Sequence, residues 1–164
     1  MKSTALTAGT LLLGILFAPV FAADDDALGR MALCKDSWAE WQKSDPAKLE
    51  AFKNNFGAQF SRHGNDAYFV PKKAVSLLGL RVMQAVPGNV GMGVGFSLAV
   101  DATFEDARRK MEAQLGKALQ KCESGEGMRN CELEIAPQRT VTLMSEDKPG
   151  SRHTLIGCYY FYEK

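Results

Sequence analysis

The sequence predicts an α+β fold: two N-terminal helices, then a mostly antiparallel five-stranded sheet with one inserted helix, in the order α-α-β-β-α-β-β-β. Apolar residues recur at helical spacing in the first third of the chain and again after position 103. Elsewhere apolar and polar residues alternate, which is typical of half-buried strands. Four cysteines are expected to staple the fold with disulfides. We find no internal repeat or linker, so residues 23–164 are expected to form one domain.

The N-terminus has the pattern of a secretory signal peptide over residues 1–22. Lys2 precedes an apolar run from Leu11 to Phe21, and Ala22 provides a small residue at the expected cleavage point. The run has about half the length that a membrane-spanning helix needs. We therefore expect removal of this segment rather than an uncleaved membrane anchor. The remaining chain is expected to work in the periplasm.

The first helix after the signal peptide is predicted from about Asp25 to Gln42. Its apolar positions lie about one turn apart, at Leu28, Met31, Cys34 or Lys35, Trp38 and Trp41. Asp45 is the predicted N-cap of the second helix, and Pro46 occupies its first position. This helix is expected to end near Phe60. Its apolar face is expected to belong to the core and consists of Leu49, Phe52, Phe56 and Phe60.

The five predicted strands cover residues 78–86, 91–102, 130–136, 139–146 and 154–163, in addition to a short stretch at 67–70. The sequence Pro87-Gly88-Asn89 is the predicted turn of a hairpin between the first two. Thr103 is the predicted N-cap of the inserted helix, with Asp106 at the capping-box position. Turn residues at 137–138 and 148–151 separate the last three strands.

The cysteines are expected to form two disulfides, because an even number in an exported chain is typical of disulfide pairing. Three pairings are possible. We favour Cys122–Cys131, which closes a short loop, and Cys34–Cys158, which ties the first helix to the last strand. The alternative is a zinc site, but the sequence lacks the C-x-x-C pair that is typical of such sites.

The charge balance disfavours two classes of partner. The sequence has 20 Lys and Arg residues against 19 Asp and Glu residues, and loss of Lys2 leaves 19 of each. Without a basic stripe interleaved with aromatic residues, nucleic-acid binding has no electrostatic basis. Without a polybasic amphipathic helix, binding to a membrane surface is not expected either.

We find no catalytic set and expect no enzyme activity and no cofactor. The two histidines, His63 and His153, lie in a polar loop and at the start of a strand, and no nucleophile is identifiable beside them. Glu132 and Glu134 alternate along one strand, which is typical of a solvated face. HExxH, GxSxG and GxxxxGK motifs are absent from the sequence.

Three features suggest contact surfaces. In the segment from 91 to 100, glycines that include Gly93 and Gly95 leave one strand face bare, either for close packing of a helix of this chain or for a partner. In the last strand, Tyr159 and Phe161 share a face that is either exposed for recognition or buried. The loop closed by Cys122–Cys131 presents Met128 and Arg129, either as a preorganised binding element or as a simple hairpin connection.

An export signal, a small mature chain, four cysteines and no catalytic set together resemble the periplasmic immunity proteins that Gram-negative bacteria make against effectors of type IV or type VI secretion systems. Small periplasmic inhibitors of lysozyme-type hydrolases are similar to a lesser degree. The resemblance implies neutralisation of a secreted toxin by a tight protein–protein complex, and it implies no particular site residues. The alternatives are a small periplasmic hydrolase and an envelope-assembly or structural component.

Overall fold

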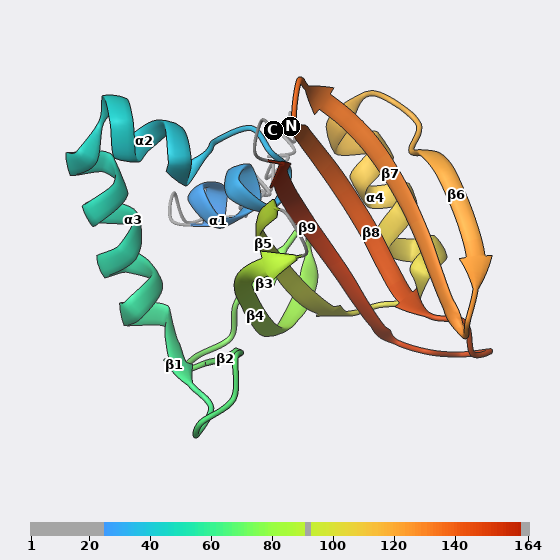
Figure 1. The fold of residues 1–164 in the computed structure, drawn as a ribbon. Helices are drawn as coiled ribbons and strands as arrows, with labels where there is room; N and C mark the ends of the chain where they lie inside the picture. The colour runs from blue at the N-terminus through green and yellow to red at the C-terminus, as the bar shows by residue number, and fades with distance from the viewer. Residues whose placement is uncertain (1–24, 91–92, 162–164) are drawn as a thin grey trace, which may run out of the picture.

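The structure is a computed structural model that describes residues 25–90 and 93–161. The predicted signal peptide, residues 1–22, lies outside the described residues. The strands form one sheet in the order β1-β2-β4-β5-β9-β8-β7-β6, with β3 beside β4, and every pairing is antiparallel. Figure 1 shows the helices α1 (Asp25–Ala32), α2 (Trp38–Ser44), α3 (Pro46–Gln59) and α4 (Phe104–Leu115) around this sheet.

The α+β class is confirmed, but the expected five strands were wrong, because the described residues form nine. The strands are β1 (Phe60–Arg62), β2 (Phe69–Pro71), β3 (Ser76–Leu77), β4 (Leu80–Val90), β5 (Gly93–Asp101), β6 (Gln120–Gly125), β7 (Met128–Ala136), β8 (Arg139–Glu146) and β9 (His153–Phe161). The first three are too short for an alternating pattern to show. β6 is exposed along its whole length, so it has no apolar alternation.

The predicted helix over residues 25–42 was also wrong, because it is two helices, α1 and α2. Cys34 adopts a left-handed backbone conformation with φ of 56° and interrupts the helix. Beside it, the Asp36 carboxylate accepts two hydrogen bonds from Arg30, at 2.7 and 3.0 Å. The Ser37 hydroxyl then caps α2 by accepting from the Glu40 N–H at 3.2 Å.

The other helix starts agree with the sequence. Asp45 caps α3 by accepting a hydrogen bond from the Lys48 N–H at 3.1 Å, and Pro46 is the first helical residue. Thr103 caps α4 by accepting from the Asp106 N–H at 3.2 Å. These helix caps can be predicted from the sequence because a cap depends only on residues three positions apart.

The predicted turn at Pro87-Gly88-Asn89 was wrong. Pairing between β4 and β5 continues to Val90 opposite Gly93. On its other side, β4 pairs with β3 at Leu80 and Arg81 and with β2 at Ala85 opposite Phe69. Beyond Ala85 no described strand pairs with this side, so that part of β4 forms an outer edge among the described strands. A proline is tolerated on such an edge because its missing N–H faces no partner strand.

All four helices lie on one face of the sheet. Met31 of α1 and Cys34 after it meet Tyr160 and Cys158 of β9, and α4 packs on β8 and β9. Figure 1 shows α4 behind β7 and β8. The core between these layers includes fully buried residues from every layer, among them Met31, Leu98, Met111, Leu143 and Ile156. None of the described helices has the length and apolar character needed to cross a membrane.

Candidate functional site

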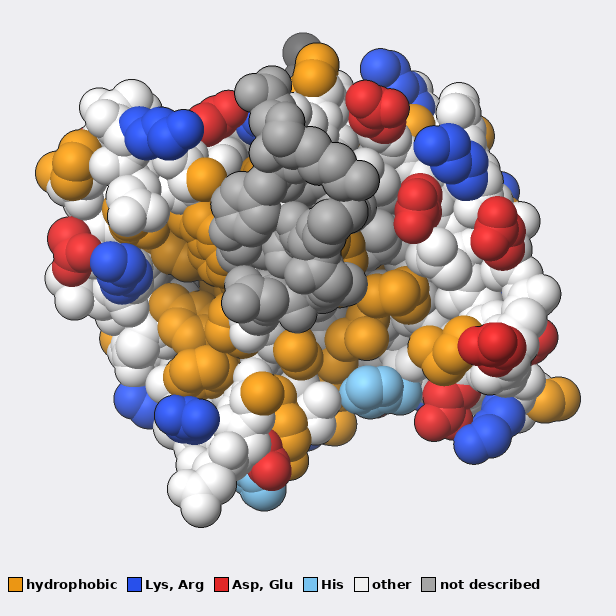
Figure 2. All heavy atoms as spheres, viewed as in Figure 1, with side chains coloured by type: hydrophobic (Ala, Val, Ile, Leu, Met, Phe, Trp, Pro, Cys, Tyr) orange, Lys and Arg blue, Asp and Glu red, His pale blue; other side chains and the backbone are white. Residues whose placement is uncertain are grey.

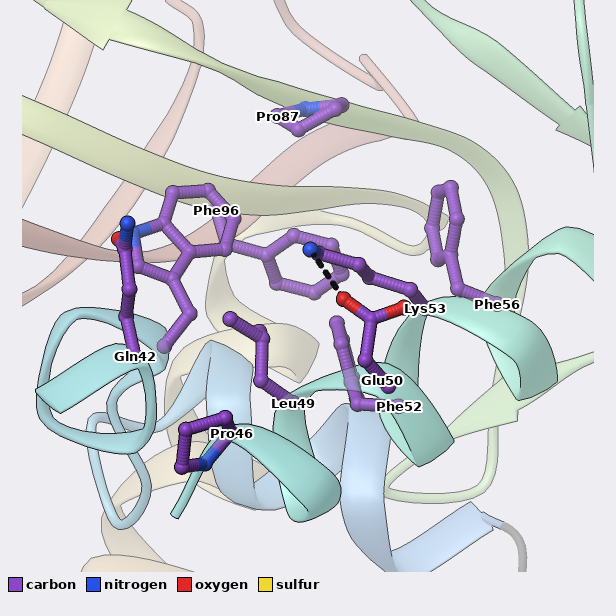
Figure 3. Close-up of a pocket in the computed structure, with 10 residues that line it drawn as sticks. Gln42, Pro46, Leu49, Glu50, Phe52, Lys53, Phe56, Pro87 and Phe96 are labelled. Atoms are coloured by element: carbon purple, nitrogen blue, oxygen red, sulfur yellow. Dashed lines mark hydrogen bonds and ion pairs between the residues drawn. The ribbon is translucent and has the colours of Figure 1, made fainter. Parts of the chain in front are cut away.

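A groove of about 610 Å³ lies between α2 and α3 on one side and the β4–β5 strands on the other. We call it the aromatic groove. Figure 2 shows hydrophobic side chains gathered in this hollow beside α2 and α3, and Figure 3 shows the groove in close-up. Its lining consists of Trp38, Gln42, Pro46, Leu49, Glu50, Phe52, Lys53, Phe56, Pro87 and Phe96.

One wall is the apolar face of α3. Leu49, Phe52 and Phe56 recur at helical spacing and point toward the sheet (Figure 3). The sequence pattern assigned this face to the core, but only Phe60, beyond the helix end, is fully buried. The other three pack against the core and remain half-exposed. This part of the expected core is therefore the wall of a groove.

The floor of the groove is Phe96 of β5, which is only 1% exposed. Three rings meet it edge-on, with centroid distances of 5.9 Å to Phe52, 6.0 Å to Phe56 and 6.2 Å to Trp38. Edge-to-face contacts at these distances are favourable and fix the mutual orientation of the rings. The groove is thus formed by rings that hold one another in place.

The connection between α1 and α2, which precedes Trp38, is bonded to β9 of the sheet. Cys34 is joined to Cys158 of β9, and the hydroxyl of Tyr160, also in β9, donates a hydrogen bond to the carbonyl oxygen of Asp36 at 2.7 Å. Burial raises the pKa of Tyr160 to about 12, so this hydroxyl keeps its proton throughout the physiological range. The wall that carries Trp38 is therefore rigidly attached to the sheet.

An ion pair fixes the other side of α2. Arg139 of β8 contacts Glu40 of α2 at 2.9 Å, one residue before Trp41. Trp41 is buried and packs edge-on against Phe52, with ring centroids 5.8 Å apart. α2 is thereby held between β8 and α3, which keeps the groove open in one shape.

The rim carries charges that cancel. Lys53 and Glu50 pair at 2.7 Å on the exposed side of α3, drawn as a dashed line in Figure 3. The remaining eight lining residues have no ionisable side chain. The groove therefore suits an uncharged apolar group, and it contains no acid–base pair aimed at its floor.

The loop expected to present Met128 and Arg129 is a β6–β7 hairpin closed by the Cys122–Cys131 disulfide. Met128 is 43% exposed. Arg129 is occupied within the molecule, because its guanidinium pairs with Glu105 at 2.6 Å and lies 4.3 Å from the centroid of the Phe104 ring. Both favoured disulfide pairs are thus present, and of the two residues expected to form a contact surface only Met128 is free of contacts with charged partners in the described part of the chain.

The glycine strip and the last strand meet each other. Tyr159 is buried, with 9% of its surface exposed, so of the two alternatives for this strand face the buried one holds at Tyr159. Its ring covers Gly95 on the neighbouring strand, and its hydroxyl lies 3.1 Å from the hydroxyl of Ser97. The cover over Gly95 is therefore an aromatic side chain of the sheet itself rather than a helix. Gly93 pairs with Phe161 through the backbone. The side chain of Phe161 lies outside the described residues.

The candidate catalytic residues do not converge in the described part of the chain. The Nδ1 atom of His63 lies 2.9 Å from both the Asp66 carboxylate and the Tyr68 hydroxyl, in the exposed β1–β2 loop. His153 begins β9, opposite Asp101 of β5. Within residues 25–90 and 93–161, no three His, Cys, Asp or Glu side chains are placed to hold a metal ion.

Sequence patterns indicated the apolar helix positions Trp38, Leu49, Phe52 and Phe56, but not that they line a groove. Its members belong to two helices and a hairpin that are separated by up to about 58 positions, from Trp38 to Phe96. Comparison of the chain with protein-family models, with curated proteins and with solved structures finds no match.

Proposed function

We propose that this chain is an exported binding protein that acts as a periplasmic immunity protein and neutralises a secreted effector by forming a tight complex with it. The observation that carries the proposal is the aromatic groove, where half-exposed Trp38, Leu49, Phe52 and Phe56 stand ready to accept an apolar group. Large aromatic side chains in a preformed hollow are the usual centre of a protein-binding surface.

The disulfide and the hydrogen bond that anchor Trp38 support the same role. Binding costs less when the receptor surface is already in its bound shape, because little side-chain and loop entropy remains to be lost. The Cys34–Cys158 bond and the Tyr160–Asp36 contact restrict the wall that would otherwise move. Two disulfides also suit a protein that works in an oxidising compartment.

The test is protection of cells against effectors encoded beside this gene. Each effector is directed to the periplasm of a host that lacks the gene, and survival is measured with and without the full-length chain. We expect rescue by the full chain and loss of rescue when residues 1–22 are deleted. Failure to rescue cells from any neighbouring effector, with the protein folded in the periplasm, would contradict the proposal.

Two matched variants connect rescue with the aromatic groove. Leu49→Glu places a charge on the wall, and Ala47→Glu places the same charge on the exposed side of the same helix. We expect rescue to be lost with the first and retained with the second. Rescue that depends instead on His63 or His153 would favour the alternative of a small hydrolase. Retention in a large envelope assembly without any toxin partner would favour an assembly component.

A further inference from the structure

We infer that the aromatic groove receives one amphipathic α-helix of its protein partner, through uncharged apolar side chains spaced one turn apart. This inference rests on the proposed function and adds the chemistry of the occupant. It follows from three properties of the groove: its dimensions, the polar groups that it lacks, and the state of the sheet edge beside it.

The wall on α3 has the periodicity of a helix partner. Leu49 and Phe56 are seven residues apart, which corresponds to about 10 Å along a helix axis. Two turns of a second helix lying along this wall would place side chains at i, i+4 and i+7 against it. The length of the apolar wall therefore matches two or three anchors on a neighbouring helix.

The groove has few hydrogen-bonding groups for the backbone of a bound extended segment. Six of the ten lining residues (Pro46, Leu49, Phe52, Phe56, Pro87 and Phe96) have no polar side-chain atom, and Glu50 and Lys53 are bound to each other. The indole N–H of Trp38 and the amide of Gln42 are the other polar side-chain groups of the lining. Two such groups cannot pair the whole backbone of an extended segment, which would leave most of its N–H and C=O groups unpaired on these walls, at a free-energy cost for each group. A helix avoids this cost because its backbone groups bond internally.

The sheet edge beside the groove is a poor acceptor for an added strand. Beyond Ala85, no strand in the described part of the chain pairs with the outer side of β4, so a strand of a partner could in principle pair there. Pro87 lies on this edge and has no N–H to donate, and Figure 3 shows it across the groove from α3. Proline on an exposed edge opposes strand addition. This disfavours an added strand and favours a helix that binds through its side chains.

The charges at the rim of the groove also favour an apolar helix face as the occupant. The ion pair between Lys53 and Glu50 leaves the rim without net charge, and the floor at Phe96 is fully apolar. A charged anchor would lose its hydration without finding an unpaired counter-ion. The complementary surface is a stripe of leucine, phenylalanine or similar residues.

The experiment titrates ¹⁵N-labelled residues 23–164 with three probe peptides and follows amide chemical shifts. The first is a hydrocarbon-stapled helix with leucines at i, i+4 and i+7. The second has the same composition in alternating order, and the third is a proline-rich segment. We expect the helix to shift signals of α3 and of the β4–β5 strands and to bind at least tenfold more tightly than the other two.

The variants set the controls. Leu49→Glu is expected to weaken binding of the helix at least tenfold, and Ala47→Glu less than twofold. Absence of binding by the helix, equal binding of the extended peptides, or shifts confined to the β6–β7 hairpin near Met128 would overturn the inference. Rescue of cells that depends on Leu49 together with a failed titration would reject the helical occupant and leave the proposed function standing.

Discussion

The ring of Tyr159 occupies the space that a Cβ atom on Gly95 would need, on the neighbouring strand of the sheet. The hydroxyls of Tyr159 and Ser97 lie 3.1 Å apart, which holds the ring down along β5. A glycine inside a strand weakens it unless something uses the space. Here the space is used by an aromatic side chain of the same sheet, on the face opposite the helices.

Gly95→Val is therefore expected to destabilise the fold by about 1–3 kcal/mol, the usual cost of overpacking. Gly125→Val, in β6, is the matched control because nothing lies within 4 Å of the position that its Cβ would occupy. Chemical denaturation of both variants measures the difference. If the two substitutions cost the same, the contact between Tyr159 and Gly95 does not constrain the sheet.

The two disulfides are expected to differ in both accessibility and contribution to stability. Cys34 and Cys158 are 1% and 0% exposed and span 124 positions, whereas Cys122 and Cys131 span only nine, with Cys122 on the exposed edge strand. Graded reduction followed by alkylation and mass spectrometry should label Cys122 and Cys131 first. Labelling of Cys34 before Cys122 would contradict this order.

Removal of each bridge by paired alanine substitutions should follow the loop lengths. In the chain-entropy account, a bridge over more than 100 residues contributes nearly 5 kcal/mol, and a short loop contributes about 3 kcal/mol or less. We expect Cys34→Ala with Cys158→Ala to lower the melting temperature more than Cys122→Ala with Cys131→Ala does. Only the Cys34→Ala and Cys158→Ala substitutions should loosen the attachment of the segment that carries Trp38.

Features that depend on a few neighbouring residues were predictable from the sequence. The caps at Asp45 and Thr103 belong to this group. The pairing of Cys34 with Cys158 could be predicted for a different reason, because four cysteines allow only three connectivities. The interruption at Cys34 was not predictable, because the apolar spacing continues through it to Trp38. The disulfide partner of Cys34 is Cys158 of β9, 124 positions away, which helical spacing within one segment does not reveal. The three short strands β1 to β3 have too few residues for any period to appear.

The candidate site was harder to predict for a related reason. Helical spacing of Leu49, Phe52 and Phe56 shows that one face of α3 is apolar, but not how much of that face the sheet covers. Coverage depends on how α3 packs against the sheet, where Phe52 and Phe56 meet Phe96, a residue far along the chain. The same spacing therefore describes a core face and a groove wall equally well.

Arg129 is expected to contribute to stability and not to recognition, because its guanidinium is engaged by Glu105 and the Phe104 ring. Arg129→Ala should lower the free energy of unfolding by about 1 kcal/mol, since exposed ion pairs and cation–π contacts are each worth that or less. Met128→Asp, next to it, should leave rescue from the effector unchanged. Loss of rescue with Met128→Asp in a folded protein would move the binding surface from the groove to the β6–β7 hairpin.

Asp36 makes the fold sensitive to acid. A hydrogen bond from Arg30 lowers the pKa of Asp36 and outweighs the effect of burial, and the charges of Arg30 and Lys48 act in the same direction. A carboxyl whose pKa is lower in the folded state than in the unfolded state contributes stability above its unfolded pKa, near 4. That contribution disappears as the pH falls through the folded pKa. Asp36→Asn should therefore be less stable than the wild type at pH 7, and the difference should shrink below about pH 4.

Denaturation at a series of pH values measures this difference, with Asp147→Asn as a control for removal of one exposed acidic charge. The Asp36 backbone also accepts the hydrogen bond from Tyr160, so the carboxylate and the Trp38 anchor belong to one small network. Trp38 fluorescence should accordingly change with the same acid transition. A difference between Asp36→Asn and the wild type that persists unchanged to pH 2 would show that the variant disturbs packing rather than the ion pair.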